Sequence, residues 1–345
     1  MKIGVIGAGR FGRLHVQVLQ QLPGVEVTAI ADKNIEAAKE AADWYGIPVT
    51  YDNGEALIKD ENAEAIDVVS DESTHGRFAI LALQENKHVF VEKPLAVTYK
   101  EASAIEQEAE GRNCAVMAGH ICRFSLPYIT MKRQVEKGML GSLRSLRLAR
   151  DFNRTWFETF GHRVHPVYES GIHDLDLLIW FAGTKWKSIQ AIQQYSLSYY
   201  VEPDSFASLI EFDNGIYAVL QSSWLLPDQA PQTIVDSLEL NGTIRAELEL
   251  IGSSGSARFN GAKQGTEIWT NERVFHPDNT LWPHTGSQVS GAIKEELSYF
   301  CDVAAYNKKQ EWIPLHEAVV SLEMAEAIEV AAKTGERVVK SNVRL

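Results

Sequence analysis

Glu169 and His173 have the residue types and the spacing of a proton-transfer pair. They are four positions apart, and the apolar residues at 175, 178, 179 and 181 predict that a helix begins here. Both side chains would then lie on one helical face. Histidine titrates near neutral pH, and a carboxylate one turn away can orient its ring and favour its charged form. Gly171, between them, leaves room for a close approach. The pattern predicts a general base with its orienting partner; a structural histidine that caps or bridges helices is the alternative.

A second motif, Glu92-Lys93-Pro94, directly follows the predicted strand His88–Val91. The carboxyl end of a parallel strand is where such sheets bind their ligands. Pro94 would stiffen the turn and hold Lys93 at this ligand-binding edge, with Glu92 next to it. A solvated Glu–Lys pair in an ordinary loop is the alternative interpretation.

The motif Gly7-x-Gly9-x-x-Gly12 follows the first predicted strand and opens a helix, which is the context of a dinucleotide-binding loop. Gly7 would allow the tight turn, Gly9 would let the backbone approach a pyrophosphate, and Gly12 would let the helix pack on the strand. The amides of Arg10, Phe11 and Gly12 would point at the anion, assisted by the helix dipole.

Asp32 ends the second predicted strand, 20 residues beyond Gly12, where an acidic side chain receives the ribose hydroxyls. A carboxylate about 4 Å from a 2′-phosphate would cost roughly 4 kcal/mol at an effective dielectric near 20. The sequence therefore predicts NAD in preference to NADP. Lys33, Arg10 and Arg13 are nearby cations that could soften this preference.

The elements that must position these residues follow two different patterns. In the first third, short apolar strands alternate with helical stretches, which predicts an α/β Rossmann domain over residues 1–121 with a parallel sheet covered on both faces. The predicted strands are Lys2–Ile6, Glu26–Ala31, Val49–Tyr51, Ile66–Val69, His88–Val91 and Ala115–Ala118, and the predicted helices are Gly12–Leu22, Ile35–Tyr45, Phe78–Glu85 and Thr98–Gly111.

After a junction near Gly119–Arg123, the strands lengthen and alternate polar with apolar residues. This predicts an α+β domain over residues 122–345, built on a large, mostly antiparallel open sheet. Asp213-Asn214-Gly215 is a hairpin signal. The predicted strands are Leu143–Arg150, Ser188–Ser198, Phe206–Phe212, Ile216–Trp224, Ser237–Asn241 and Arg245–Ile251. The predicted helices are Val289–Tyr306 and Leu315–Thr334, of which the last could pack back on the first domain.

Composition narrows the class of protein. A chain of 345 residues with 45% hydrophobic and 23% charged residues suffices for two globular domains. A net charge of −13 argues against nucleic acid and anionic membranes as partners. The sequence has no apolar run near about 18 residues and no signal-peptide pattern. Its three scattered cysteines form no CxxC and favour a reduced, cytoplasmic setting.

The sequence predicts no metal site. His162, His165, Glu169 and His173 follow one another at intervals of three, four and four residues, which one helix would align. Pro166 makes a continuous helix unfavourable, and no HExxH motif is present.

Two segments before the predicted catalytic helix, 153–156 and 161–166, are rich in hydrogen-bonding and stacking side chains. Trp156, His162 and Arg163 are therefore predicted to line a substrate site, with an ordinary loop as the alternative. Trp282 and His284 are weaker candidates for the substrate site, whereas His15 and His316 are expected to be structural.

With these motifs in order, the sequence resembles the Gfo/Idh/MocA oxidoreductases, which include glucose–fructose oxidoreductase and inositol dehydrogenase. The resemblance rests on the glycine loop, on Glu92-Lys93-Pro94 and on Glu169-x-Gly171-x-His173, and it spans essentially the whole chain. Supporting pieces are His75 with its following helix, Arg123-Phe124-x-x-Pro127 and Gly138-Met139-Leu140-Gly141.

The resemblance implies an NAD-dependent enzyme that reversibly oxidises a secondary alcohol of a sugar or cyclitol. Lys93 would hydrogen-bond the reacting hydroxyl and His173 would transfer its proton. Arg123 would join the substrate contacts, and a homodimer or homotetramer would form because open sheets with one bare face tend to pack together. The expected cofactor-binding residues are Gly7, Gly9, Arg10, Phe11, Gly12, Asp32, Lys33, Ser70, His75, Glu92 and Lys93.

The sequence departs from the family at two places. Glu169 stands where the family usually has Asp, and Ser70-Asp71 stands where it often has Thr-Pro, which could alter contacts beside the nicotinamide. Two other functions stay open: a glycosidase or eliminase that oxidises its substrate transiently, and a non-catalytic NAD-binding regulator. The presence of both Lys93 and His173 argues against the regulator.

Overall fold

The computed structural model describes residues 1–155, 161–196, 200–228, 232–235, 237, 240–242, 244–261, 265–271 and 274–342. The chain divides into two compact units. Unit 1 contains Met1–Phe124 and Leu281–Leu322, and unit 2 contains Ser125–Thr280 and the segment that begins at Glu323. Residues 281–322, which the sequence assigned to the second domain, therefore group with the first unit.

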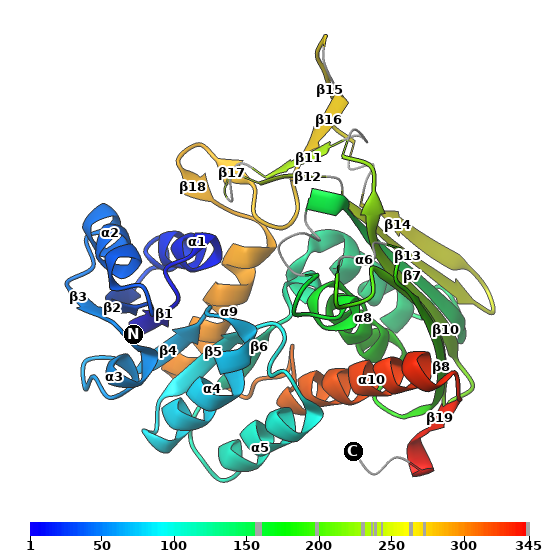
Figure 1. The fold of residues 1–345 in the computed structure, drawn as a ribbon, viewed down its shortest axis with the longest axis horizontal. Helices are drawn as coiled ribbons and strands as arrows, with labels where there is room; N and C mark the ends of the chain where they lie inside the picture. Colours follow the sequence, from blue (N-terminus) through cyan, green and yellow to red (C-terminus); the bar gives the residue numbers. More distant parts are fainter. Residues whose placement is uncertain are drawn as a thin grey trace. The chain divides into compact units, whose positions relative to one another are not determined.

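Unit 1 is built on a six-stranded sheet whose strand order is β3-β2-β1-β4-β5-β6 (Figure 1). All five neighbouring pairs are parallel, which confirms the predicted Rossmann arrangement. Strands β1, β2, β4, β5 and β6 are almost entirely buried because helices cover the sheet. The strands are β1 (Lys2–Ile6), β2 (Glu26–Ala31), β3 (Val49–Tyr51), β4 (Ala65–Val68), β5 (His88–Glu92) and β6 (Val116–Gly119).

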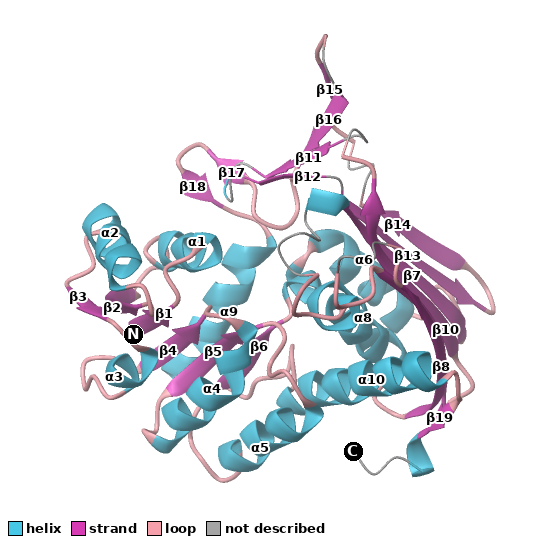
Figure 2. Ribbon diagram, viewed as in Figure 1, coloured by secondary structure: helices cyan, strands magenta, loops and turns pink. Residues whose placement is uncertain are grey.

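Helices cover both faces of this sheet, with α1 and α2 on one face and α3, α4 and α5 on the other (Figure 2). Helix α9 (Ala292–Tyr306), from the segment Leu281–Leu322 of unit 1, packs against α1. The five residues of α3 are too few to show helical periodicity, so the sequence did not predict it. The remaining helices are α1 (Arg10–Leu19), α2 (Ile35–Tyr45), α3 (Gly54–Ile58), α4 (His75–Gln84) and α5 (Tyr99–Ala109).

Unit 2 is built on a seven-stranded sheet in the order β14-β13-β7-β10-β9-β8-β19. Only the pair β7–β10 is parallel among its described strands, so the predicted mostly antiparallel sheet is confirmed. The strands are β7 (Leu143–Asn153), β8 (Trp186–Gln194), β9 (Ser205–Phe212), β10 (Tyr217–Leu226), β13 (Ile244–Gly252), β14 (Ser256–Asn260) and β19 (Val338–Val339).

Smaller strands complete both units. In unit 2, β12 (Leu240–Gly242), β11 (Gln232–Val235), β16 (Val274–Pro277) and β15 (Ile268–Trp269) form a four-stranded sheet. In unit 1, β17 (His284–Thr285) pairs with β18 (Gln288–Val289). Because β18 and the left-handed Gly291 (φ 78°) precede it, α9 begins at Ala292 rather than at the predicted Val289. The predicted strands 188–198 and 237–241 lie partly outside the described residues.

The helices of unit 2 are α6 (Leu126–Glu136) and α8 (Ile172–Ala182), which is preceded by a π-helical turn at Val167–Gly171. Helix α10 (Leu315–Thr334) agrees with the prediction, and the boundary between the units falls inside it. Within the described part of the chain, every helix is too short or too polar to cross a membrane.

Candidate functional site

The three glycines of the loop in unit 1 have different surroundings. Gly9 leaves room for a ligand, whereas Gly7 and Gly12 leave no room for a side chain. Gly7 has φ +117°, and a Cβ built on it would lie 2.4 Å from the Val69 carbonyl oxygen. A Cβ on Gly12 would lie 1.9 Å from the carbonyl oxygen of Gly7. Gly9 faces open space instead, with no atom within 4 Å of its would-be Cβ.

Gly9 is also the N-cap of α1, and no described side chain caps that helix start. The first-turn amides, including those of the predicted residues Arg10 and Phe11, therefore remain available to an anion. An open glycine at an uncapped helix start fits a dinucleotide pyrophosphate.

The carboxylate of Asp32, the predicted ribose-binding residue, is held in place by two backbone amides. Its Oδ2 accepts a hydrogen bond from the amide of Ala8 at 2.8 Å, and its Oδ1 accepts one from Asn34 at 2.8 Å. Each oxygen keeps a second lone pair for a hydroxyl donor. The half-buried carboxylate thus ties the glycine loop to the end of β2, and Lys33 beside it is exposed.

The charge of Asp32 leads to a prediction about cofactor choice. Asp32→Ser removes the carboxylate that would repel a 2′-phosphate, so we expect the ratio of Kd for NADP to Kd for NAD to fall by about tenfold or more. Fluorescence titration with both cofactors measures this ratio. Asp52→Ser, an exposed aspartate after β3, is the control. An unchanged ratio in Asp32→Ser would contradict the assignment of Asp32.

His75, at the start of α4, joins the loops that follow β4 and β5. Its buried ring lies with Nδ1 2.7 Å from the carbonyl oxygen of Pro94 and Nε2 3.1 Å from that of Ser70. The Ser70 hydroxyl itself lies 2.7 Å from the hydroxyl of Thr74. His75 thus holds the two loops together, and its predicted contact with the cofactor stays a prediction.

Lys93 follows the last residue of β5 and is half-buried. Its backbone amide donates to Glu92 Oε2 at 3.0 Å, and the other oxygen of Glu92 lies 3.4 Å from His15 Nε2. His15 Nδ1 in turn lies 3.0 Å from Asp67 Oδ2. His15 was expected to be structural and Asp67 was not predicted as a site residue, although a charged residue inside an apolar strand is itself a signal.

The segment that returns to unit 1 adds an aromatic contact to the glycine loop. Trp282 packs edge-on against the ring of Phe11, with ring centroids 5.5 Å apart. Trp282 was considered a weak candidate for substrate binding, and its position beside Phe11 instead supports the cofactor loop.

In unit 2, the predicted catalytic pair lies where a π-helical turn meets an α-helix. Glu169 belongs to the π-turn and is 8% exposed, whereas His173, the second residue of α8, is half-buried. Single π-turns inside helices occur frequently at functional sites. A Cβ on Gly171 would lie 2.8 Å from a ring carbon of Phe206, so the close approach that this glycine permits is made by β9.

Buried polar contacts hold this junction on the sheet. The Ser170 hydroxyl donates to the carbonyl oxygen of Pro166 at 3.0 Å, accepts from Trp224 Nε1 at 3.1 Å and lies 2.9 Å from the Ser222 hydroxyl. These contacts use the full hydrogen-bonding capacity of one hydroxyl. They fix the residue next to Glu169 against β10.

Directly after His173, Asp174 forms a two-pronged ion pair with Arg150 of β7, at 3.1 and 2.8 Å. Both side chains are buried, and such forked geometry fixes orientation as well as distance. The start of α8 is therefore held rigidly on the sheet.

His165 accepts a hydrogen bond from the first amide of the π-turn. Its Nδ1 lies 3.0 Å from the Val167 nitrogen, and its Nε2 lies 3.3 Å from Gln193 Oε1. Nδ1 must stay unprotonated to accept this bond. Burial lowers the pKa of His165 to about 4, although Glu329 acts in the opposite direction.

This low pKa predicts a pH-dependent stability. Unfolded His165 takes up a proton near pH 6.5, and folded His165 only near pH 4. The contribution of His165 to the free energy of unfolding is therefore fully present above pH 6.5 and is lost as the pH falls towards 4. The loss is on the order of 3 kcal/mol. We expect His165→Asn to be less stable than the wild type at pH 7, with the gap narrowing by pH 4.5 in urea unfolding. The exposed His316→Gln is the control, and parallel curves for wild type and His165→Asn would refute the prediction.

The other predicted substrate residues belong to different units. Arg123 is buried in unit 1, where its guanidinium donates to Glu317 at 2.6 Å and to the Trp312 carbonyl at 3.0 Å, which favours a structural role. His162 is exposed and packs on Tyr200 with ring centroids 4.9 Å apart, and Arg163 is also exposed. Trp156 lies outside the described residues.

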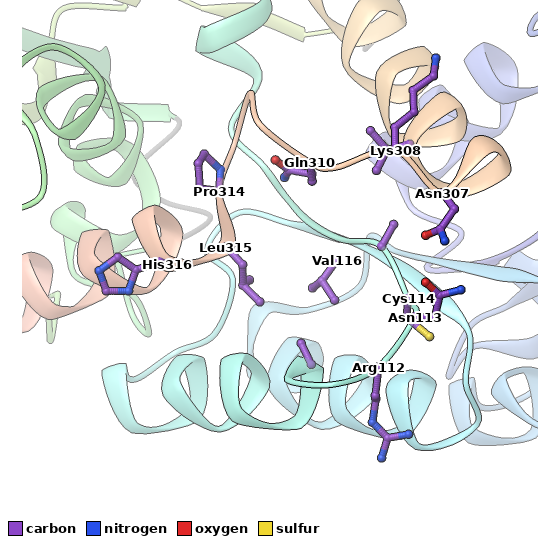
Figure 3. Close-up of a pocket in the computed structure, with 13 residues that line it drawn as sticks. Arg112, Asn113, Cys114, Val116, Asn307, Lys308, Gln310, Pro314, Leu315 and His316 are labelled. Atoms are coloured by element: carbon purple, nitrogen blue, oxygen red, sulfur yellow. The ribbon is translucent and has the colours of Figure 1, made fainter.

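Two further observations concern metal ligands and a cavity. Across the described residues, no group of three or more His, Cys, Asp or Glu could hold a metal ion. A cavity of about 360 Å³ in unit 1 is lined by residues at the start of β6 (Figure 3). Because β4, β5 and β6 are parallel, this is the opposite end of the sheet from the loops after β4 and β5. It is lined by Ala109, Arg112, Asn113, Cys114, Ala115, Val116, Val303, Asn307, Lys308, Gln310, Pro314, Leu315 and His316. None of the predicted site residues lines it.

The chain matches both domains of one protein family. Residues 1–120 match the family model described as "Oxidoreductase family, NAD-binding Rossmann fold". Residues 128–258 match the one described as "GFO/IDH/MocA C-terminal domain". Together the matches cover most of the chain.

Similar proteins include inositol dehydrogenases. The chain is 30% identical over 193 residues to the inositol 2-dehydrogenase of Salmonella typhimurium, and the alignment covers 55% of this chain and 57% of that protein. It therefore spans little more than half the length of that relative. It is 24% identical over 278 residues to the myo-inositol 2-dehydrogenase of Thermotoga maritima, with 79% of each chain covered.

Among solved structures, the fold is shared with the scyllo-inositol dehydrogenase of Lactobacillus casei, determined with bound NAD(H) and scyllo-inositol. The TM-score is 0.83 at 20% identity, and 99% of each chain is covered. Because both domain models match in order and residues 1–120 carry the parallel sheet, the chain belongs to the Gfo/Idh/MocA family of oxidoreductases, and residues 1–120 are its NAD-binding Rossmann domain.

Proposed function

We propose that this protein is an NAD-dependent dehydrogenase that reversibly oxidises a secondary alcohol of a cyclitol or a sugar. The observation that carries the proposal is the match of residues 1–120 and 128–258 to the two domains of one oxidoreductase family. Lys93 falls in the first match and His173 in the second. The inositol dehydrogenases among its relatives favour a cyclitol as substrate.

Residues of unit 1 would hold the cofactor. The first-turn amides of α1 bind the pyrophosphate beside Gly9, and Asp32 accepts the ribose hydroxyls. When bound, NAD supplies the acceptor for the hydride that leaves the carbinol carbon.

The chain's own side chains handle the proton. His173 removes the hydroxyl proton of the substrate, and the Lys93 ammonium stabilises the negative charge that develops on the same oxygen. Glu169 stabilises the imidazolium that results. Its side chain is longer than that of the Asp usual in the family, and Glu169 lies in a π-helical turn. We propose that the π-turn compensates for the longer side chain.

Several features of unit 2 support the remaining assignments. His162 and Arg163 are exposed in the segment before the π-turn, where they can contact a polyol. Exposed apolar side chains on neighbouring strands, Ile192, Leu209 and Tyr217, support a homo-oligomer formed through the open sheet.

A substrate screen tests the proposed function. Wild-type protein with NAD is mixed with myo-inositol, scyllo-inositol, other polyols and simple sugars, and NADH formation is followed by absorbance. We expect net NADH with at least one cyclitol or sugar. Cleavage of a glycoside without net NADH would indicate the transient-oxidation chemistry instead. Bound NAD with no turnover across the panel would indicate a regulator.

A further inference from the structure

Three buried charged side chains form a chain of contacts beneath Lys93. Asp67 lies on β4, His15 on α1 and Glu92 at the end of β5. Asp67 Oδ2 is 3.0 Å from His15 Nδ1, and His15 Nε2 is 3.4 Å from Glu92 Oε1. The other Glu92 oxygen, Oε2, accepts the Lys93 amide hydrogen at 3.0 Å. The contacts therefore run from the middle of the sheet to the backbone of the proposed catalytic lysine.

The three side chains are excluded from water. His15 is 0% exposed, Asp67 1% and Glu92 9%. Burial acts to lower the pKa of His15, but Asp67 and Glu92 outweigh it and raise the pKa to about 10. His15 is therefore charged at neutral pH. Burial raises the pKa of Asp67, whereas for Glu92 the effect of burial is outweighed by His15, so that the pKa of Glu92 is lowered. With both carboxyls ionised, the group carries a net charge of −1.

The surroundings accommodate this group. A Cβ on Gly119 of β6 would lie 2.8 Å from Glu92 Oε1, so a side chain at position 119 would displace the carboxylate. The His15 ring packs on Phe90 with centroids 5.7 Å apart. Cys301 of α9 has its thiol pKa raised to about 12, first by burial and then by Asp67. Among the described residues, the titratable groups that face the three side chains are thus Lys93, His75 and Cys301.

A buried ion triad is a weak source of stability, because desolvation of the ions offsets their attraction and apolar residues often replace such groups without loss. Its geometry does confer specific orientation. A Glu92 carboxylate without His15 could turn or take up a proton, and the Lys93 amide would lose a charged acceptor.

We infer that His15 is a positioning residue for catalysis: by holding Glu92 between its imidazole and the Lys93 amide, it fixes the place from which the Lys93 side chain acts. This inference rests on the proposed function of Lys93. Asp67 anchors the far side of the same imidazole.

His15→Gln tests this role, because glutamine keeps a donor but no charge. It leaves two buried carboxylates and a net charge of −2, which favours proton uptake by one of them. We expect kcat for the substrate found in the screen to fall by about 10- to 100-fold, the loss typical of a misplaced group. We also expect a new pH dependence of kcat between pH 6 and 8, and a Kd for NAD within about threefold of the wild type.

Charge restoration separates positioning from general damage. In the double variant His15→Gln/Asp67→Asn the net charge returns to −1, so we expect kcat above that of His15→Gln alone and no new pH dependence. Val16→Ala, a fully buried neighbour on α1, is the matched control that removes packing without changing charge. It should lower the thermal midpoint and leave the pH profile of kcat unchanged.

A second readout needs no substrate. Acetylation of Lys93 by acetic anhydride is followed by peptide mass spectrometry, with the exposed Lys39 as internal reference. We expect the Lys93 rate, relative to Lys39, to change at least threefold in His15→Gln and not in Val16→Ala. If the wild type oxidises no polyol, this measurement still decides the inference. An unchanged relative rate for Lys93 in His15→Gln would overturn it, as would a kcat and pH profile equal to those of Val16→Ala.

Discussion

His173→Gln is expected to lower kcat for polyol oxidation by about 10²–10⁴-fold, the range that a positioned general base contributes. Glutamine has a similar reach and can hydrogen-bond a hydroxyl, but it cannot accept its proton at neutral pH. The rest of the start of α8 should be unaffected, because the Arg150–Asp174 ion pair and the Ser170 contacts hold it independently.

Steady-state kinetics and a titration with NAD distinguish this result from misfolding. The Kd for NAD should stay within about threefold of the wild type, because the proposed cofactor residues all belong to unit 1. His316→Gln, an exposed histidine paired with Glu106, is the matched control and should keep full activity. A kcat within about threefold of the wild type in His173→Gln would remove His173 from the mechanism.

Lys93→Met is expected to have an effect of similar size, a fall in kcat of about 10²–10⁴-fold. Methionine keeps much of the side-chain length but has neither the charge nor the hydrogen-bond donors that stabilise a developing alkoxide. The backbone contact with Glu92 does not depend on the side chain, so the local fold should survive.

Two further variants test the role of the Lys93 side chain. Lys93→Arg keeps the charge with a different shape, so it should recover part of kcat but not all of it. Lys39→Met, at an exposed position, should be indistinguishable from the wild type. Should Lys93→Met turn over as fast as Lys39→Met, the alkoxide would have to be stabilised by another group.

Much of the cofactor domain could be predicted from sequence because its determinants are local. The strands of unit 1 were predicted to within one or two residues, since buried parallel strands read as short apolar runs. The glycine positions follow from constraints within one strand–turn–helix unit, where a Cβ at Gly7 or Gly12 would meet the backbone. Asp32 directly follows the next strand, β2. The order of the motifs along the chain was sufficient to recognise the family.

The roles of several residues depended on partners distant in the chain. Arg123 has the chemistry of a substrate ligand, but its partner Glu317 lies 194 residues away. His75 was assigned to the cofactor, and only the tertiary structure places its ring between two loop carbonyls. No periodicity indicates that residues 281–322 pack with the first unit, because long-range packing depends on which surfaces meet.

The local conformation of the Glu169–His173 motif also could not be predicted from its spacing alone. The spacing suggested one α-helical face, but the turn that contains Glu169 is π-helical and is held by Ser170, Trp224 and His165 from the surrounding structure.

The sequence by itself therefore determined the fold class, the dinucleotide site and the residue types available for chemistry, because these depend on short-range sterics and hydrophobic periodicity. Only the tertiary structure decided which charged groups are buried together. His15, Asp67 and Glu92 come from three separate elements, and their contact beneath Lys93 exists only because β4 and β5 lie side by side with α1 across them.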